Sequence, residues 1–166
     1  HAALDATRPT AVNLRWALDR VRRRIAPLVP TDRADAAWHE ADAIAAEDVA
    51  INHAIGEHGV RILERIAARN AGPVNVMTHC NAGALATCGW GTATAPVFLA
   101  HARGLAVHVW VSETRPRLQG ANLTAWELAQ RGVLGEEQRL GWVDALRVAN
   151  TRTQLYGVEY EVGAQQ

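Results

Sequence analysis

The sequence contains a cysteine at a position where a reactive thiol is expected. Cys80 follows the apolar run at residues 73–79, which predicts a buried strand, and precedes NAGALATCGWGTA, a stretch rich in Gly, Ala and Thr. A strand that leads through a Gly-rich turn into a helix presents backbone N–H groups and the positive end of the helix dipole, which favour a thiolate. Alternatively, Cys80 is a small buried residue beneath a tight turn. We expect Cys88 to lie further into the helix and to be structural.

A second polar segment, SETRPRLQGANLTAWEL, follows the apolar run at residues 106–111, which predicts another strand. Ligands of open α/β sheets bind at the carboxyl ends of the strands, so this loop should face the turn that carries Cys80. Gln119 and Asn122 supply neutral donors of the kind that bind sugar hydroxyls. The segment is therefore a candidate substrate-binding loop.

The same segment also carries positive charge. Arg115 or Arg117 could bind an anion, because a guanidinium pairs well with carboxylate or phosphate oxygens. Structural alternatives remain open: Arg115 could pair with Glu113, and Asn122 or Thr124 could cap the helix that follows.

A third candidate, Arg8, lies in the TRPT sequence ahead of the first predicted helix. An arginine at a helix entrance could hold a phosphate, although this pattern alone is weak. His39, His53 and His58 are spread along the chain without the spacing of metal ligands, so we expect ordinary surface or capping histidines and no metal site.

The N-terminal part of the chain has a helical pattern. Residues 10–29 show an amphipathic period, and Pro27 and Pro30 predict where this helix ends. Residues 34–69 are rich in Ala, Glu, Ile and Leu at helical spacing, and they predict two helices that separate near Gly56 or Gly59. We therefore assign residues 1–71 to a helical N-terminal region.

From residue 72 the pattern changes to alternating strands and helices. The two predicted strands are separated by a helix that ends near Gly104, and residues 125–131 predict a further helix. This order is typical of a right-handed parallel unit, so the fold class is α/β, with a partial Rossmann-like domain at residues 72–133. Residues 136–148 predict a helix and residues 156–162 a strand in the C-terminal tail.

Composition excludes several classes of protein. With 49% hydrophobic residues in 166, the chain can form a core, and a formal net charge of zero argues against a nucleic-acid binder. No apolar run is long enough for a membrane span or a signal peptide. Two cysteines without a framework pattern indicate a reducing compartment, so we expect a cytoplasmic protein. Because the chain starts at His1, we expect that an upstream segment has been lost.

Four segments together resemble a known family. TRPTAVNL, AEDVAINHAIGEHG, THCNAGALAT with GWGTA, and ETRPRLQGANLTAWEL are similar to the motifs of S-methyl-5-thioribose-1-phosphate isomerases, in the same order over residues 5–133. That family is related to the regulatory subunits of translation initiation factor two-B. The resemblance implies an aldose–ketose isomerase of methionine salvage that needs no metal or organic cofactor and forms a homodimer.

The resemblance also implies roles for three residues. Cys80 matches the motif cysteine, a general acid or base. Gln119 matches a residue that contacts the sugar, and Arg8 matches an arginine that holds the phosphate. The substrate would be a phosphosugar, S-methyl-5-thioribose 1-phosphate.

Other family motifs are absent, so the chain is expected to be truncated or incomplete. Residues 134–166 match none of the motifs, the segment with the catalytic aspartate is missing, and the chain has no lysine for the NKIGTY stretch. Two alternatives stay open: a ribose-1,5-bisphosphate isomerase, and an inactive regulatory or assembly module like the initiation-factor relatives.

Overall fold

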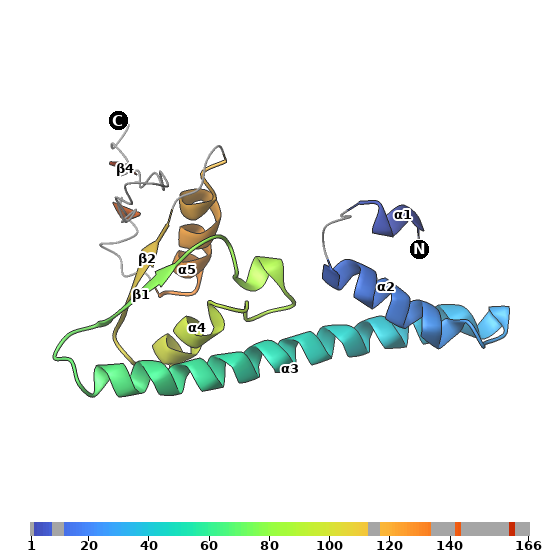
Figure 1. Ribbon diagram of the computed structural model, residues 1–166, viewed down its shortest axis with the longest axis horizontal. Helices are drawn as coiled ribbons and strands as arrows, with labels where there is room; N and C mark the ends of the chain where they lie inside the picture. The colour runs from blue at the N-terminus through green and yellow to red at the C-terminus, as the bar shows by residue number, and fades with distance from the viewer. Residues whose placement is uncertain (1, 8–11, 113–116, 134–141, 144–159, 162–166) are drawn as a thin grey trace. The chain divides into compact units, whose positions relative to one another are not determined.

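A computed structural model describes residues 2–7, 12–112, 117–133, 142–143 and 160–161 of the chain (Figure 1). The chain divides into two compact units, His1–Ala50 and Ile51–Gln166. The division falls inside one long helix, and each unit is described separately below. The domain boundary that the sequence predicts at residue 71 stays a prediction.

Helices form the first unit. They are α1 (Ala2–Asp5), α2 (Val12–Ile25), a single 3-10 turn at Pro30–Asp32, and the beginning of α3 (Arg33–Ala67). The predicted amphipathic helix is confirmed as α2, which ends before Pro27 because a proline disfavours helical backbone at the residue that precedes it. An ion pair of 2.9 Å between Arg15 and Asp5 joins α2 to α1.

Arg20 connects α2 to α3 within this unit. Its guanidinium donates to Glu40, at 2.6 Å, and to Glu47. The hydrogen bonds with Glu47 and Glu40 raise the pKa of Arg20 above its ordinary value, and the bond with Arg20 lowers the pKa of the Glu47 carboxyl. The guanidinium also lies 5.6 Å from the ring centre of Trp16. Arg20 thus makes the shortest of the described ion pairs between α2 and α3, and Arg24 adds a longer one to Glu40 at 3.8 Å.

The second unit contains a parallel sheet of two strands. Its elements are the remainder of α3, β1 (Val74–Thr78), α4 (Ala95–Ala102), β2 (Val107–Val111), a π-helical turn (Gly120–Ala125) and α5 (Trp126–Gln130). β1 and β2 pair in parallel, with Val74 opposite Val107 and Thr78 opposite Val111. Both predicted strands and the two predicted helices that follow them are confirmed, so the chain has an α/β fold with a helical N-terminal region.

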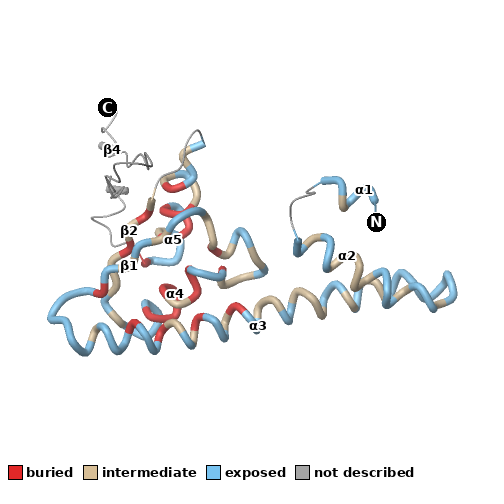
Figure 2. The backbone as a smooth tube through the Cα atoms, in the orientation of Figure 1, coloured by how far each residue is buried: buried red, intermediate tan, exposed pale blue. Residues whose placement is uncertain are grey.

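Within the described residues, helices cover one face of the sheet and no helix packs on the other, which is called the open face below. The covered face packs on helices through two buried clusters, of which the first contains Val97, Phe98, Val109, Val111, Ala125, Leu128 and Val133, and the second Val60, Leu63, Val74, Leu99 and Ala100. Figure 2 shows the buried segments gathered in α4, α5 and the part of α3 beside α4. On the open face, Trp110 donates to Asn75 Oδ1 at 2.9 Å, and Met77 is 48% exposed.

The prediction of two helices at residues 34–69 is wrong, because α3 is continuous from Arg33 to Ala67. Gly56 and Gly59 do not break it. They lie where α3 meets α4: a Cβ at Gly56 would be 2.5 Å from Leu99 Cδ1, and one at Gly59 would be 2.3 Å from Pro96 Cγ. The glycines let two helices approach closely, and the packing offsets their low helix propensity.

The helix predicted at residues 136–148 is wrong where the structure describes it. Trp142 and Val143 form the short strand β3 (Trp142–Val143), which pairs in an antiparallel ladder with β4 (Tyr160–Glu161). Aromatic and β-branched residues favour extended backbone, and this preference outweighs the weak helical period. β4 falls within the strand predicted at residues 156–162, and the other residues of both predictions lie outside the described ranges.

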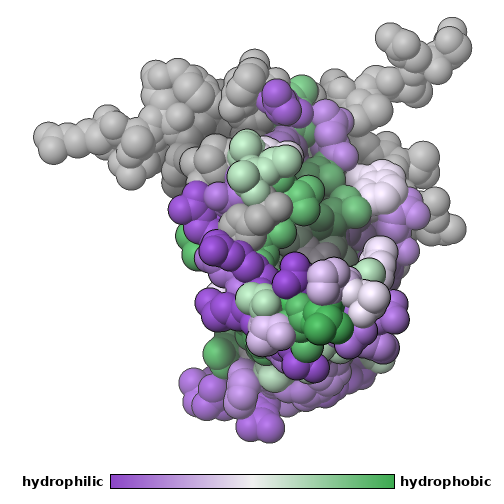
Figure 3. All heavy atoms as spheres, turned by 90° about the vertical axis from the view of Figure 1, so that its right-hand side faces the viewer, coloured by the Kyte–Doolittle hydropathy of each residue, from purple (hydrophilic) through white to green (hydrophobic). Residues whose placement is uncertain are grey.

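A stripe of apolar side chains stays exposed on α3 of the second unit. Its members, at spacings of one and two helical turns, are Ile51, Ile55, Ile62 and Ile66. Figure 3 shows apolar surface next to hydrophilic surface on the face that it displays. None of the helices in the described ranges has the length and hydropathy that a membrane span requires.

The close approach of α3 and α4 leads to a first prediction. Gly59→Ala should lower the free energy of unfolding by about 1 kcal/mol, because overpacking typically costs about 1–3 kcal/mol and exceeds the gain in helix propensity of about 1 kcal/mol. Urea denaturation measures this difference. Gly72→Ala is the control, because no heavy atom lies within 4 Å of the Cβ it would add. A Gly59→Ala variant more stable than the parent would contradict the contact with Pro96.

Candidate active site

The two polar segments leave the sheet at the same edge. β1 ends at Thr78 and β2 at Val111, which are register partners. Beyond the strands, Ser112 N donates to Thr78 O at 3.1 Å, and His79 Nδ1 lies 2.7 Å from Ser112 Oγ. The residues that follow the two strands are therefore held side by side at the carboxyl edge, where ligands of parallel sheets bind.

Cys80 is the second residue after β1 and has an unusual backbone. Its φ is 63°, in the left-handed region, which residues other than glycine seldom occupy. The residue is exposed, so the alternative of a buried cysteine beneath a turn is wrong. Strained backbone of this kind is found most often at functional sites, where the surrounding structure maintains it.

The expectation that a helix begins close to Cys80 is wrong. Residues 79–94, named the cysteine loop below, contain only a 3-10 turn at Ala84–Ala86, and α4 begins at Ala95. Cys88 is exposed in this loop rather than inside a helix. Glycine and threonine disfavour a helix here, since threonine hydroxyls bind backbone groups of the loop instead. No helix dipole therefore acts on Cys80 from α4.

Threonine side chains fold the cysteine loop back on itself. Thr87 Oγ1 accepts a hydrogen bond of 3.0 Å from Gly91 N. The buried Thr94 donates to Trp90 O at 3.1 Å, and Thr92 N donates to Ala82 O at 2.8 Å. These bonds give the loop a defined conformation without regular secondary structure.

Glu127 of α5 joins the cysteine loop to the second polar segment. Its side chain is only 5% exposed. One carboxylate oxygen accepts from the backbone N–H groups of Ala84 and Leu85, and the other accepts from Asn81 Nδ2 at 3.3 Å. A Cβ at Gly83 would lie 1.9 Å from that second oxygen. Gly83, in CNAGAL, therefore leaves the space that the carboxylate of Glu127, in TAWEL, occupies.

Arg131, one helical turn after Glu127, holds the other end of the loop. Its guanidinium donates to Gly89 O at 2.9 Å and lies 4.8 Å from the ring centre of Phe98. Arg131 is the C-cap of α5, so the helix and its cap contact the cysteine loop at two points. Sequence reasoning missed both residues. One feature of the sequence could have indicated Glu127: it is the single acidic residue of the helical segment TAWELAQ.

Asn122 and Thr124 are not helix caps, so that alternative is wrong. Both lie in the π-helical turn that continues directly into α5. Thr124 is 2% exposed, and its hydroxyl accepts from Asn81 Nδ2 at 3.4 Å. Asn122 Nδ2 donates to Arg117 O at 3.5 Å.

Two of the three predicted site residues lie within the described ranges, Cys80 beyond the carboxyl end of β1 and Gln119 before the π-helical turn. Gln119 is exposed at the start of the π-helical turn, after Leu118, whose φ of 51° is also left-handed. Arg8, Glu113 and Arg115 lie outside the described residues. In the described ranges, no group of three His, Cys, Asp or Glu side chains is arranged to hold a metal ion.

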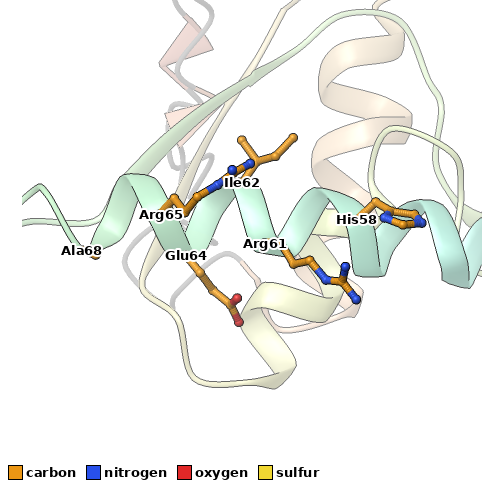
Figure 4. A pocket seen from close by; sticks show the side chains of 6 residues that line it. All are labelled: His58, Arg61, Ile62, Glu64, Arg65 and Ala68. Carbon is orange, nitrogen blue, oxygen red and sulfur yellow. The ribbon is translucent and has the colours of Figure 1, made fainter.

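A shallow depression on α3 contains none of these residues. Its lining consists of His58, Arg61, Ile62, Glu64, Arg65 and Ala68. Figure 4 shows that these side chains spread to different sides of the helix and do not converge on one point. The depression therefore has the character of a solvated helix face.

The sequence of the chain is similar to those of one protein family and of several enzymes. The sequence model of the Initiation factor 2 subunit family matches residues 1–134. Methylthioribose-1-phosphate isomerases of Dechloromonas aromatica and Rhodospirillum rubrum are 54% and 50% identical to the chain, with 94% and 93% of it covered. The chain belongs to the Initiation factor 2 subunit family, and it spans 45% and 43% of the length of these two relatives.

Two solved structures are similar in fold. A 5-methylthioribose 1-phosphate isomerase from Pyrococcus horikoshii OT3 has a TM-score of 0.65 and 41% identity over 78% of this chain and 35% of its own. The translation initiation factor eIF-2B subunit delta from A. fulgidus has a TM-score of 0.63 and 39% identity over 77% and 36%. The expected family relationship is confirmed.

The cysteine loop provides a second prediction. Gly91→Ala should destabilise the chain by about 1–3 kcal/mol more than Gly104→Ala, because it adds overpacking to the cost of a left-handed alanine. Both glycines have a φ of 76°, but only at Gly91 would a Cβ meet other atoms, 2.2 Å from Thr94 Oγ1 and 2.6 Å from Ala82 O. Urea denaturation compares the two variants. Equal losses would show that the loop is not closely packed at Gly91.

Proposed function

We propose that this chain is part of a methylthioribose-1-phosphate isomerase, which converts S-methyl-5-thioribose 1-phosphate to the corresponding ribulose 1-phosphate in methionine salvage. The observation that carries the proposal is the exposed, left-handed Cys80 at the carboxyl edge of the parallel sheet. The two relatives at 54% and 50% identity, both named as this isomerase, support the choice of reaction.

The reaction assigns Cys80 the role of general acid or base. A hydrogen moves from C2 to C1 of the sugar, and the bond between C1 and the ring oxygen breaks. The released ring oxygen takes up a proton to become a hydroxyl, and the C2 hydroxyl gives up its proton as it becomes a carbonyl. A thiol that can donate or accept a proton next to these carbons lowers the barrier. Gln119 would donate to a sugar hydroxyl, and Arg8 would hold the phosphate.

We also propose that the full-length protein is a cytoplasmic homodimer that binds the phosphosugar and no nucleic acid. The zero net charge of the chain supports the last point. The open face of the sheet and the exposed stripe on α3 support association with further polypeptide, because parallel sheets are normally covered on both faces.

A hybrid enzyme gives the third prediction. Residues 1–133 replace the matching segment of the Dechloromonas aromatica relative, and turnover of the phosphosugar is followed by NMR. The hybrid should be active, and Cys80→Ser should lower kcat by about 10²–10⁴-fold, the usual contribution of a general acid or base.

Cys88→Ser is the matched control, because Cys88 is the other exposed cysteine of the same loop. It should leave kcat within about threefold of the parent hybrid. Full turnover in the Cys80→Ser hybrid would remove Cys80 from the mechanism.

The fourth prediction concerns Gln119. In the same hybrid, Gln119→Ala should raise KM about tenfold and change kcat less, since one hydrogen bond to the substrate contributes on the order of 1 kcal/mol. Gln130→Ala, which removes another exposed glutamine on the adjacent helix, should leave KM unchanged. An unchanged KM for Gln119→Ala would place the sugar elsewhere.

A regulatory or assembly module is the second candidate. The initiation-factor subunit from A. fulgidus resembles the chain almost as closely in fold as the Pyrococcus isomerase does, with TM-scores of 0.63 and 0.65. Fold alone therefore does not choose between the two functions. Binding of the phosphosugar to the hybrid in calorimetry, without turnover, would favour the regulatory function.

A further inference from the structure

We infer that Glu127 is a positioning residue of the candidate active site, whose buried carboxylate holds Cys80 in its left-handed conformation. The catalytic consequence of this inference rests on the proposed isomerase function. The positioning itself is a property of the chain, so it can be tested without turnover.

The first step is the environment of the carboxylate. Glu127 is 5% exposed and belongs to α5, whereas all its described hydrogen-bond donors belong to the cysteine loop. A buried carboxylate is costly unless donors satisfy its oxygens, and bonds to a charged acceptor are stronger than bonds between neutral groups. The carboxylate therefore binds the loop tightly, and the loop in turn satisfies the carboxylate.

The second step is the place of these donors in the chain. Asn81 directly follows Cys80, and Ala84 and Leu85 come immediately after Gly83. On the other side, His79 is held 2.7 Å from Ser112 at the end of β2. Cys80 therefore lies between two anchored neighbours, and its backbone cannot relax without breaking one of these contacts.

The third step concerns strain. A left-handed non-glycine residue persists only where the surrounding structure maintains it. Side-chain contacts of His79 and Asn81 flank Cys80. Asn81 has two acceptors, and its bond to Glu127, at 3.3 Å, is shorter than its bond to the Thr124 hydroxyl, at 3.4 Å. Loss of the carboxylate should thus let Cys80 return to an ordinary conformation and move its thiol.

The variants separate positioning from general stability. Glu127→Ala removes the acceptor. Glu127→Gln keeps the shape and one carbonyl oxygen for Ala84, and a turned Asn81 amide can accept from the new NH₂ group. Glu127→Gln should therefore preserve the loop where Glu127→Ala does not, and Gln130→Ala on the same helix is the control.

The fifth prediction uses two readouts on the 166-residue chain. Carbon-13 chemical shifts of Cys80 should indicate left-handed backbone in the parent and in Glu127→Gln, and ordinary backbone in Glu127→Ala. The rate of alkylation by iodoacetamide should change at Cys80 but not at Cys88 in Glu127→Ala. A loss of structure in general would change both cysteines together.

Turnover in the hybrid enzyme links positioning to function. Glu127→Ala should lower kcat about 10²-fold, because a displacement on the order of 1 Å can have that effect, with little change in KM. Glu127→Gln should restore kcat to within about tenfold. An inactive parent hybrid would overturn the proposed function. It would not affect the conclusion that the chemical shifts give on the backbone of Cys80.

Left-handed Cys80 shifts and unchanged alkylation in Glu127→Ala would overturn the inference. If Glu127→Ala does not fold, Asn81→Ala is the second variant, because it removes the contact next to Cys80 and retains the bonds of Glu127 to Ala84 and Leu85. Ordinary backbone at Cys80 in Asn81→Ala supports the inference, and unchanged left-handed backbone overturns it.

Discussion

The carboxylate of Glu127 organises the candidate site, because a buried negative charge requires donors and the cysteine loop provides them. The loop has little regular structure, and its 3-10 turn meets the same carboxylate through Ala84 and Leu85. A glycine at residue 83 is necessary for this approach, since any side chain there would overlap the carboxylate. The conformation of Cys80 follows from these constraints together with the contact between His79 and Ser112.

The parallel pairing of β1 and β2 determines where the segments that follow the two strands begin. Because the strands are in register at Thr78 and Val111, the segments after them begin at one edge. α4, which lies between the two strands in the chain, and α5, which follows β2, pack on one face of the sheet. Glycines in α3 then allow α4 to approach closely, at Gly56 beside Leu99 and at Gly59 beside Pro96.

Membership of the Initiation factor 2 subunit family is consistent with both enzymatic and non-enzymatic relatives. What favours an isomerase in our proposal is the exposed thiol of Cys80 on strained backbone at the carboxyl end of β1. The alignment with the Dechloromonas aromatica relative covers 94% of the chain and so extends past residue 134, where the family model ends.

Sequence by itself determined the α/β class, both strands, their shared carboxyl edge and the position of Cys80 beside it, because hydrophobic periodicity and strand order are local patterns. It did not determine that α3 is continuous, since packing against Pro96, distant in sequence, offsets the low helix propensity of Gly59. It also did not show which backbone groups the threonine hydroxyls of the cysteine loop would bind in place of a helix. The left-handed backbone of Cys80 and the role of Glu127 likewise depended on tertiary structure. A carboxylate on one segment and its donors on another form a site only when folding brings them within hydrogen-bonding distance.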